Sequence, residues 1–564
     1  MMTDVLSPGL IMIAGAALLP LLRGYWQRGF MLLLPVVGFW QTLMLEPGTY
    51  GIVDMFGVTL TTLRVDSLSL VFGYIFHIAA FLSAIYALHV RDTVQHVAGM
   101  AYAGAAIGAV FAGDLITLFV YWELTAVTSV FLIWARREEN SYSTGLRYLI
   151  IQVGSGVVLL AGIVIHQQQS GSIEFSKLTL GELGPTLIFL AFGVKCAFPL
   201  LHNWLQDSYP EATVTGTVFL SAFTTKLAVY ALARSFAGTE MLIWIGATMT
   251  AFPIFYAVIE NDLRRVLAYS LNNQLGFMVV GIGIGTELAL NGTAAHAFCH
   301  ILYKALLFMS MGAVLLRTGT VKGSELGGLY KSMPWTTGFC IVGAASISAF
   351  PLFSGFISKS MIITASADGG HWFVWGVLLF ASAGVFHHSG IKIPYFAFFA
   401  HDSGIRVKEA PFNMLLAMAV AAFLCIGIGV FPGPLYAILP FPVDFVPYTV
   451  THVITQLQLL LFSALAFAVL MRFGIYPPEL KSVNLDTDWF YRRLAPKVVR
   501  AVWGGVSALQ GRIVREAARA LNHLLVVVFH YHGPDGVLAR TWPIGGAALW
   551  VLILLGGFLI IYFV

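Results

Sequence analysis

Hydrophobic residues along this chain form long runs that are separated by short polar segments. Most runs hold about 20 residues, the length of helix that crosses a hydrocarbon core of roughly 30 Å. Cutting the sequence at charges and at Gly/Pro clusters gives runs that begin near residues 5, 29, 65, 94, 114, 146, 184, 213, 240, 264, 291, 336, 371, 411, 452 and 543. The pattern predicts an all-α polytopic membrane protein with about 16 transmembrane helices.

The composition excludes a soluble enzyme. Hydrophobic residues make up 58% of the chain and charged residues 10%, against the roughly 25% charged residues of an ordinary soluble domain. The net charge of +4 comes from Lys and Arg placed between the apolar runs. Because nucleic-acid binding needs a clustered basic face, no nucleic-acid partner is expected.

The cysteines argue against redox chemistry within this chain. All four lie inside apolar runs, and no C-x-x-C pair is present to hold zinc or an iron–sulfur cluster: Cys196, Cys299, Cys340 and Cys425. We therefore expect no cofactor and no metal. Whether the chain counts as an enzyme depends on the complex that contains it.

The positive charges are distributed unevenly over the loops between the runs. Even-numbered loops carry Arg64, Lys177 and Arg234, whereas most other Lys and Arg lie on odd-numbered loops, among them Arg23, Arg28, Arg136, Arg137, Arg147, Arg264, Arg265, Arg317, Lys322, Lys331, Arg406, Lys408, Arg472 and Lys481. By the positive-inside rule the odd loops are cytoplasmic and both termini lie outside. The first run, which follows Asp4, has no clear cleavage site and is expected to be a retained helix. We expect a multi-pass protein of a bacterial inner (plasma) membrane.

Three segments break the alternation of run and short loop. They are a β-prone stretch over 48–63, a polar loop over 167–184 and a long polar stretch over 484–541. Within the last, apolar residues recur at helical spacing opposite Arg and Lys, which predicts an amphipathic helix lying flat on the cytoplasmic face. Pro496 and the Gly504-Gly505 pair are expected to kink it. It serves either as an anchor for the final span or as a brace across the bundle.

A short internal repeat marks two of the apolar runs. The tetrapeptide AFPL occurs at 197–200 and again at 349–352, near Lys195 and Lys359 respectively. Proline in mid-span breaks a helix and leaves carbonyls to be satisfied by water or neighbours. Paired broken helices in corresponding places indicate a transporter built from two related halves with its ion path at the midplane.

Several ionisable residues fall inside predicted spans, where each charge costs about 2.5–3.5 kcal/mol. They are Glu123, Lys195, Lys226, His296, His300, Lys304 and Lys359. The residues at 296, 300 and 304 are four apart, so they follow one face of a helix. Histidine can accept and donate a proton near neutral pH, and a desolvated lysine approaches the same range. We interpret this row as a path for protons rather than as hydrogen-bonded core residues.

Glu123 is the only acid well inside a predicted span. Its neighbours Trp122 and Tyr121 would keep water away, and a lysine partner would keep both groups charged. Lys195 is the first candidate for that partner. If a proton arriving at Lys226 repels the charge of Lys195, the Glu123–Lys195 pair opens and closes with protonation; the alternative is a static ion pair between two helices.

Six segments together carry a resemblance to a known family. They are FGVKCAFPLLHNWLQD (192–207), TKLAVY (225–230), NDLRRVLAYS (261–270), KALLF (304–308), GGLYKSMP (327–334) and PLFSGFISK (351–359). The chain resembles, from about residue 60 to 410, the proton-pumping antiporter-like membrane subunits shared by respiratory complex I, membrane-bound hydrogenases and multisubunit Mrp cation/proton antiporters. Lys359 places it nearest the Mrp D-type and distal complex I subunits, because some relatives carry Glu there.

The resemblance implies roles for each ionisable residue. It implies two inverted five-helix repeats, with broken helices carrying Lys195 and Lys359. By the family pattern the fifth-span acid is Glu123, the seventh-span lysine Lys195, the central lysine Lys226, the eleventh-span connection His296, His300 and Lys304, and the exit-side lysine Lys359.

The domain organisation follows from the runs and the resemblance together. We expect three N-terminal helices (1–93), a first repeat (94–236), a second repeat (240–400), two C-terminal helices (411–474), the amphipathic helix (484–541) and a final span (543–564). The segment after 486 is similar to the start of the lateral helix of the distal complex I subunit, though shorter. Residues 384–404, with two histidine-containing pairs, fit the family poorly and are expected to form a cytoplasmic loop.

The sequence thus predicts a subunit that moves protons, alone or in exchange for Na⁺, within a multi-protein membrane complex. Three settings remain open: an Mrp-like antiporter, a redox-driven pump of the complex I or hydrogenase type, and a proton-driven inorganic carbon uptake complex. A structural scaffold subunit is the alternative from another class. The coupled ion, the direction of transport and the partner subunits are not determined by the residues.

Overall fold

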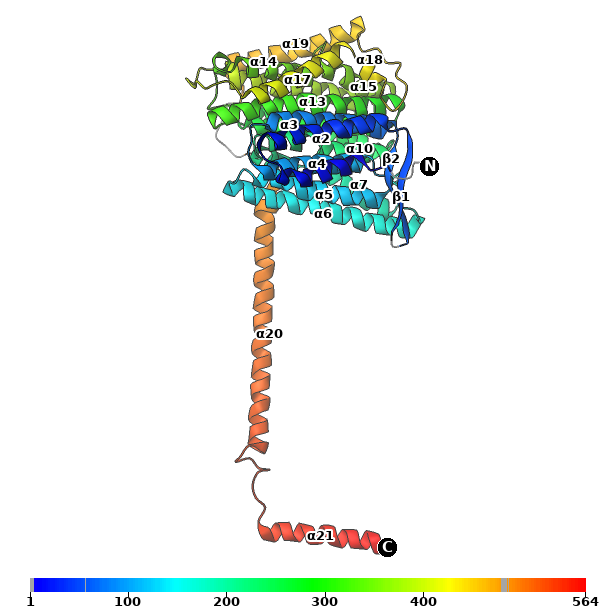
Figure 1. Cartoon of the computed structure of the whole chain (residues 1–564). Coiled ribbons are helices and arrows are strands. Elements are labelled where there is room, and N and C mark those ends of the chain that lie inside the picture. The colour runs from blue at the N-terminus through cyan, green and yellow to red at the C-terminus, as the bar shows by residue number, and fades with distance from the viewer. Residues whose placement is uncertain (1–4, 56, 478–483, 485) are drawn as a thin grey trace. The chain divides into compact units, whose positions relative to one another are not determined.

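The computed structural model describes residues 5–55, 57–477, 484 and 486–564. Asp4 and Lys481, which entered the topology argument, lie outside these residues. The chain divides into two compact units, Met1–Asn484 and Leu485–Val564. The first is a bundle of helices with one small sheet, and the described residues of the second form helices joined by a short non-helical segment (Figure 1).

The first unit contains the helices that the apolar runs predict. Its elements, in which η1 and η2 are 3-10 turns and η3 and η4 are π-helical, are α1 (Pro8–Leu18), η1 (Leu19–Leu21), α2 (Gly24–Met44), β1 (Gly48–Met55), β2 (Val58–Val65), α3 (Ser67–Ala87), α4 (Thr93–Val110), α5 (Leu115–Trp134), α6 (Glu139–Ser170), α7 (Leu183–Lys195), α8 (Asn203–Glu211), α9 (Gly216–Ala222), α10 (Thr224–Ser235), α11 (Glu240–Ile259), α12 (Leu263–Ile284), α13 (Glu287–Thr318), η2 (Leu329–Lys331), α14 (Pro334–Ile347), α15 (Ser354–Asp368), α16 (Trp372–Val385), η3 (Phe386–Lys392), η4 (Tyr395–Phe399), α17 (Phe412–Val430), α18 (Gly433–Tyr436) and α19 (Val450–Arg472).

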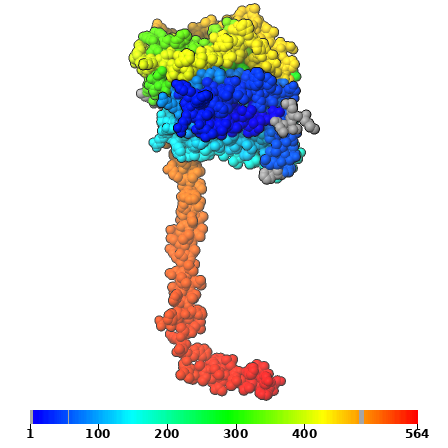
Figure 2. All heavy atoms as spheres, viewed as in Figure 1, coloured from blue at the N-terminus to red at the C-terminus, as the bar shows by residue number. Residues whose placement is uncertain are grey.

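The predicted helix positions agree with the structure. A helix begins close to each predicted start, and the largest offset is at 146, where α6 begins at Glu139. Ten helices among the described residues are long and apolar enough to cross a membrane. Apolar side chains are also exposed on the outside of the first unit, among them Trp26 and Trp40 of α2. Figure 2 shows α1 and α2 (dark blue) on one face of this unit. The protein is therefore a predominantly helical membrane protein.

The β-prone stretch forms an antiparallel hairpin. Strands β1 and β2 pair in register from Gly48 opposite Val65 to Met55 opposite Val58. The hairpin is anchored to the bundle, because the Gly113 amide donates to the Thr61 carbonyl at 2.9 Å. The polar loop predicted from 167 begins later, because α6 continues to Ser170.

Loops of odd number contact one another, and so do loops of even number. Among odd-numbered loops, Arg137 pairs with Asp92 at 3.1 Å and Lys331 with Asp402 at 2.7 Å. Among even-numbered loops, the Arg64 guanidinium donates to the Phe175 carbonyl at 2.5 Å. Such contacts are expected when successive helices cross the bundle in alternating directions.

Helix α13 lies at the centre of the bundle. It packs against α3, α9, α12, α14, α15 and α17, and its residues are buried along nearly the whole length from Asn291 to Val314. The polar residues of α13 are therefore held away from the outer surface of the unit.

Both AFPL segments have the same unusual backbone. Ala197 and Leu200 have φ of 60° and 71°, and Ala349 and Leu352 have φ of 56° and 73°. These are left-handed values that non-glycine residues rarely adopt. In each case a helix ends just before the segment and another begins just after it: α7 and α8 flank the first, and α14 and α15 the second. The predicted breaks are confirmed.

The prediction of a cytoplasmic loop over 384–404 is wrong for most of that segment. Residues 384–399 continue the helix of α16 through η3 and η4, and Trp372–Phe399 is one of the ten candidate spans. Gly384 and Gly390 lie inside this helix where neighbouring residues approach closely, since a Cβ at Gly390 would meet the Ser348 hydroxyl. Only the end of the segment is a loop, in which hydrogen bonds from Arg406 and Lys331 hold the pKa of Asp402 well below its usual range.

The second unit consists of η5 (Phe490–Leu494, π-helical), α20 (Ala495–His532) and α21 (Ile544–Phe563). Helix α20 is amphipathic, as predicted, and is a single long helix in Figure 1. The kink expected at Gly504-Gly505 is absent, because α20 continues through both glycines; Pro496 lies in the first turn, where proline needs no hydrogen-bond partner. Helix α21 is apolar throughout and is one of the ten candidate spans.

Candidate functional site

Lys195 is the last residue of α7 and is completely buried. Its ammonium group donates to the Trp122 carbonyl at 2.5 Å and to the Thr125 hydroxyl at 2.8 Å, and it lies 4.3 Å from the centre of the Trp122 ring. Helix α7 ends at Lys195, directly before the AFPL break. The Lys195 ammonium group therefore contacts α5 next to this break. The charge is therefore held by a carbonyl, a hydroxyl and an aromatic face.

Glu123 is adjacent to these partners on α5 and is half-buried. Among the ion pairs of the described residues there is none between Glu123 and Lys195, so the expected pair is not formed in this structure. Oε1 of Glu123 is buried and has no hydrogen-bond partner among the residues that the structure describes. A buried carboxylate oxygen without a partner costs free energy. The residue that faces this oxygen from α6 is Gly156.

We predict that Gly156→Ala disturbs Glu123 selectively. A Cβ at Gly156 would lie 1.4 Å from Oε1 of Glu123, whereas a Cβ at Gly154 has nothing within 4 Å. The carboxylate must move, and any activity that depends on its position should fall by about tenfold, the equivalent of 1.4 kcal/mol. Gly154→Ala on the same helix should leave activity unchanged, and equal activity of both variants in a transport assay would contradict the role of Glu123.

Lys226 follows a break between two helices. Helix α9 ends at Ala222 and α10 begins at Thr224, with Phe223 at φ −104° and ψ −65° between them. The Lys226 ammonium group donates to the Ser221 carbonyl at 2.5 Å and is completely buried. The break thus supplies a carbonyl acceptor for a lysine in the interior of the bundle.

His296 is the best-connected member of the row on α13. Its ring nitrogens lie 3.1 Å from the Ser358 hydroxyl and 3.2 Å from Oε1 of Gln274. The Tyr303 hydroxyl also donates to Gln274 at 3.2 Å. The His296 ring is therefore held between α15, which carries Ser358, and α12, which carries Gln274.

His300 and Lys304 are buried without hydrogen-bond partners among the described residues. The ring centres of His296 and His300 are 6.2 Å apart, and the Lys304 ammonium group lies 5.9 Å from the Phe308 ring centre. Buried polar atoms of this kind ordinarily bind a partner or a water molecule. His296, His300 and Lys304 all lie on α13, four residues apart, so the prediction that they follow one face of a helix is confirmed.

Lys359 lies on α15 after the second break. Its ammonium group donates to the carbonyl of Ile347, the last residue of α14, at 3.0 Å and lies 5.1 Å from the Phe277 ring centre. In the AFPL alignment Ile347 corresponds to Lys195. The two lysines thus occupy different positions in the repeat, and Lys359 reaches back to the break from the following helix.

The helices that carry these residues pack in succession. Helix α7 packs against α10, α10 against α12 and α13, and α13 against α15. The structure therefore places Lys195, Lys226, the α13 row and Lys359 on adjoining helices, while Glu123 lies on α5 at the start of the series. Groups of three or more His, Cys, Asp or Glu that could hold a metal ion are absent from the described residues.

Sequence reasoning missed three polar residues that contact the row, and a buried histidine that interacts electrostatically with Lys304: Gln274, Tyr303, Ser358 and His388. The first three are uncharged, so their presence in an apolar run gives a weak signal. His388 is fully buried and was assigned to the segment expected to be a loop.

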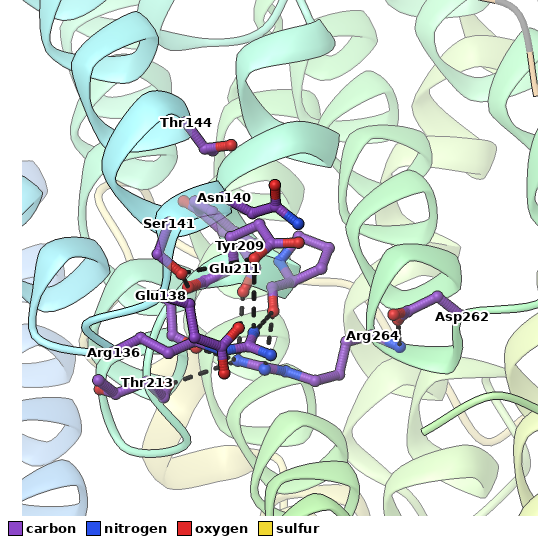
Figure 3. A network of polar contacts seen from close by, with 12 residues as sticks. Arg136, Glu138, Asn140, Ser141, Thr144, Tyr209, Glu211, Thr213, Asp262 and Arg264 are labelled. Carbon is purple, nitrogen blue, oxygen red and sulfur yellow. Dashed lines mark hydrogen bonds and ion pairs between the residues drawn. The ribbon is translucent and has the colours of Figure 1, made fainter. Parts of the chain in front are cut away.

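Ionic clusters lie outside the buried row, at loops from both sets. Asp66, at the start of α3, accepts from Arg234 at 2.8 Å. Burial opposes the ionisation of Asp66, but the hydrogen bond from Arg234 lowers its pKa overall. Among the odd loops, the Arg136 side chain from the turn after α5 and the Arg264 side chain from the start of α12 converge beside Tyr209 and Glu211 (Figure 3).

Comparison with known proteins supports the family expected from the motifs. Residues 112–386 match the family model described as NADH:quinone oxidoreductase/Mrp antiporter, TM. The chain is 30% identical over 352 residues to the D-type Na(+)/H(+) antiporter subunit of Alkalihalophilus pseudofirmus, covering 58% of this chain and 71% of that protein. It is 26% identical over 416 residues to hydrogenase-4 component B of Escherichia coli, covering 65% of this chain and 62% of that protein.

Several curated relatives are longer than this chain; it spans about three fifths of hydrogenase-4 component B and of the A-type Na(+)/H(+) antiporter subunit of Alkalihalophilus pseudofirmus, 62% and 60% respectively. Two solved structures share the fold. The membrane-bound sulfane sulfur reductase, an archaeal respiratory membrane complex, contains a chain that aligns with a TM-score of 0.72 and 22% identity, covering 98% of this chain and 99% of that one. In the Mrp complex from Dietzia sp. DQ12-45-1b the TM-score is 0.73 with 24% identity, covering 98% and 62%. With the motifs, the fold and these relatives in agreement, the chain belongs to the NADH:quinone oxidoreductase/Mrp antiporter transmembrane family.

Proposed function

We propose that this chain is the proton-translocating subunit of a multi-protein membrane complex. The observation that supports it is the burial of five titratable residues on adjoining helices: Lys195, Lys226, His300, Lys304 and Lys359 are each at most 1% exposed. A charge at bilayer depth costs about 2.5–3.5 kcal/mol. A scaffold subunit would have no use for such a series, which disfavours the scaffold alternative.

Protons pass along the series in steps between adjoining helices. In this proposal a proton moves between Lys226 on α10 and the α13 row of His296, His300 and Lys304, and from there to Lys359 on α15. His300 and Lys304, whose polar atoms have no hydrogen-bond partner among the described residues, exchange protons through water molecules. In one state of the switch, Glu123 is apart from Lys195, and the Lys195 charge is stabilised by Trp122 and Thr125. In the second state, Glu123 approaches Lys195 and forms an ion pair with it.

The finer architecture is part of the proposal. We assign 16 spans, with inverted repeats over 94–236 and 240–400 and both termini outside. The matching left-handed backbones at the two AFPL segments support the repeats, and the contacts among loops of like number support the alternation of spans. The bundle belongs in a bacterial inner membrane, with the odd loops in the cytoplasm.

Helix α20 acts as a lateral brace on the cytoplasmic face in this proposal. Its 38 residues extend about 57 Å at 1.5 Å per residue, and within the second unit none of them is buried. Apolar residues such as Val502, Leu509 and Ile513 are exposed along it. An amphipathic helix of this kind needs a membrane surface or neighbouring subunits to cover its apolar face.

The coupled ion and the partners are tested together. The tagged chain is purified in mild detergent, its co-purifying subunits are identified by mass spectrometry, and the complex is reconstituted in liposomes with a pH-sensitive dye under an imposed potential. Proton movement that depends on Na⁺ supports antiport, and iron–sulfur or hydrogenase subunits support a redox-driven pump. A single large partner without redox centres supports proton-driven uptake. A complex that moves no protons under any of these conditions contradicts the proposal.

Glu123→Gln should separate proton movement from its coupling. Glutamine keeps the shape of Glu123 but carries no charge, so Lys195 would have no switch partner. We expect the stoichiometry between proton movement and its driving reaction or counter-ion to fall at least about twofold, with the complex still assembled. Measuring both fluxes in the same liposomes checks this, and an unchanged ratio would make Glu123 a structural residue.

A further inference from the structure

The helix that follows α16 contains a buried histidine that the proposed path does not use. His388 lies on η3, a π-helical segment, and is completely buried. π-Helical turns are rare and are frequently found at functional sites. Segment η3 packs against α11, α12, α14 and α19, so His388 lies within the second repeat.

His388 is connected to α12 through two hydroxyl groups. Its Nδ1 lies 2.9 Å from the Ser389 hydroxyl, which donates to the Ser270 hydroxyl at 2.7 Å. Since the single hydroxyl hydrogen of Ser389 goes to Ser270, Nδ1 of His388 must be the donor to Ser389 in the neutral ring. Nε2 is then the unprotonated nitrogen, and it is buried without a hydrogen-bond partner among the described residues.

The unpartnered nitrogen lies in the field of the proposed path. The cations that interact electrostatically with His388 are Lys304 on α13, Lys359 on α15, and Lys392 and His387 on its own segment. Lys304 also lacks a hydrogen-bond partner in the described part of the chain. Two buried titratable groups that interact electrostatically and have unmet hydrogen-bonding capacity are a place where water molecules bind and protons are exchanged.

Lys392, the last residue of η3, contacts the loop between α11 and α12. The Lys392 ammonium group donates to the carbonyls of Val258 at 2.7 Å and Glu260 at 2.6 Å, where α11 ends. Ser270 lies roughly 10 Å along α12 from its first residue at this same end. Arg264 and Arg265 lie in the first turn of α12 directly after this loop, and the distribution of charge predicts this end to be cytoplasmic.

The position of His388 in the second repeat parallels that of Lys226 in the first. The last span of each repeat departs from regular α-helix at a phenylalanine, Phe223 in one and Phe386 in the other. Lys226 lies three residues after the first, and His388 with Ser389 lie two and three residues after the second. Both departures therefore place a proton-carrying group in the interior of the bundle.

We propose that His388 is a proton carrier that connects the α11–α12 end of the bundle, through Ser389 and Ser270, with Lys304 and Lys359. A proton received at Nε2 makes the ring cationic. Loss of the Nδ1 proton to Ser389, with transfer of the Ser389 hydroxyl proton to Ser270 and of the Ser270 hydroxyl proton to water at the α11–α12 end, restores a neutral ring. The second repeat thereby has an access route of its own to the predicted cytoplasmic side. This inference rests on the proposed function.

The test uses the assembled complex in liposomes, with proton flux driven by a potassium diffusion potential so that no partner reaction is needed. His388→Gln keeps a hydrogen-bonding group that cannot take up or release a proton, and we expect the flux to fall at least about tenfold. His387→Gln is the matched control: its ring stacks on Tyr476 at 5.4 Å and lines an apolar groove between α11, α16 and α19. That variant should stay within about twofold of wild type.

Two more variants separate proton transfer from packing. His388→Glu restores a titratable group and should carry more flux than His388→Gln, whereas Ser389→Ala removes the hydroxyl relay and should lower flux although the ring remains. Co-purification of partner subunits checks assembly in each case. Wild-type flux in assembled His388→Gln or Ser389→Ala would overturn the inference, as would equal flux in the Glu and Gln variants. If the wild-type complex moves no protons, the proposed function is wrong as well as this inference. If the wild-type complex moves protons and the Lys226→Ala complex does not, wild-type flux in the His388 variants contradicts only the role of His388.

Discussion

Replacing Lys226 by alanine should abolish proton movement and leave the complex assembled. The lysine is completely buried and its ammonium group donates to the Ser221 carbonyl beside the break at Phe223. Lys226 is the member of the series on α10, between α7 and α13. An alanine offers no site for a proton there, and proton-transfer groups contribute about 10²–10⁴-fold to rates. The expected flux is therefore at background.

Assembly should survive because the substitution removes a costly charge. An ionised group at bilayer depth costs about 2.5–3.5 kcal/mol, and only one carbonyl acceptor loses its donor. Lys177→Ala, in the exposed loop between α6 and α7, is the matched control and should behave as wild type. The measurement compares dye-detected proton flux in liposomes that contain equal amounts of each complex. Wild-type flux in the Lys226 variant would remove it from the path.

Much of the fold could be predicted because membrane crossing imposes strong constraints on sequence. Backbone polar groups cannot stay unsatisfied in lipid, so each apolar run must be helical, and the runs gave the helix starts within a few residues. The two AFPL segments predicted breaks, and both occur with left-handed residues at Ala197 and Ala349. The spacing of 296, 300 and 304 predicted a common face, since helical geometry is local.

What could not be predicted depends on side chains that meet across helices. Whether Lys195 bonds to Glu123 or to the neighbouring Trp122 carbonyl is decided by where α7 ends against α5, which no local pattern specifies. The segment after Gly384 contains residues typical of loops, yet close packing against α14 and α12 keeps it helical. His388 was missed because its burial is a tertiary property, and because it lies in a segment that fits the family poorly and was expected to be a loop.

Arg264→Ala should destabilise the bundle rather than block a proton step. The Arg264 side chain is 1% exposed, and its guanidinium donates to the carbonyls of Pro210 at 2.9 Å, Ala212 at 3.1 Å and Tyr209 at 3.2 Å, and to the Thr217 hydroxyl. These acceptors lie where α8 ends, and the last carbonyls of a helix have no partner within it. Figure 3 shows the guanidinium within this group of oxygens.

Removal of the side chain leaves those acceptors buried without their donors. At about 1–3 kcal/mol for each unsatisfied group, with partial compensation from Arg136, which also donates to Pro210 at 2.8 Å, we expect a loss of about 3–5 kcal/mol. Thermal unfolding of the purified complex should shift strongly, with less assembled protein in the membrane. Lys322→Ala is the control, since its ion pair with Glu325 at 3.8 Å is exposed and worth at most about 1 kcal/mol.

Arg264→Lys distinguishes charge from geometry. A lysine preserves the charge but has three donors on a single nitrogen, so it cannot reach oxygens spread along the end of α8 and the following turn as a planar guanidinium does. We therefore expect Arg264→Lys to unfold at a temperature close to that of Arg264→Ala. Wild-type stability of the lysine variant would mean that the positive charge alone holds the end of α8, and the hydrogen-bond explanation would be wrong.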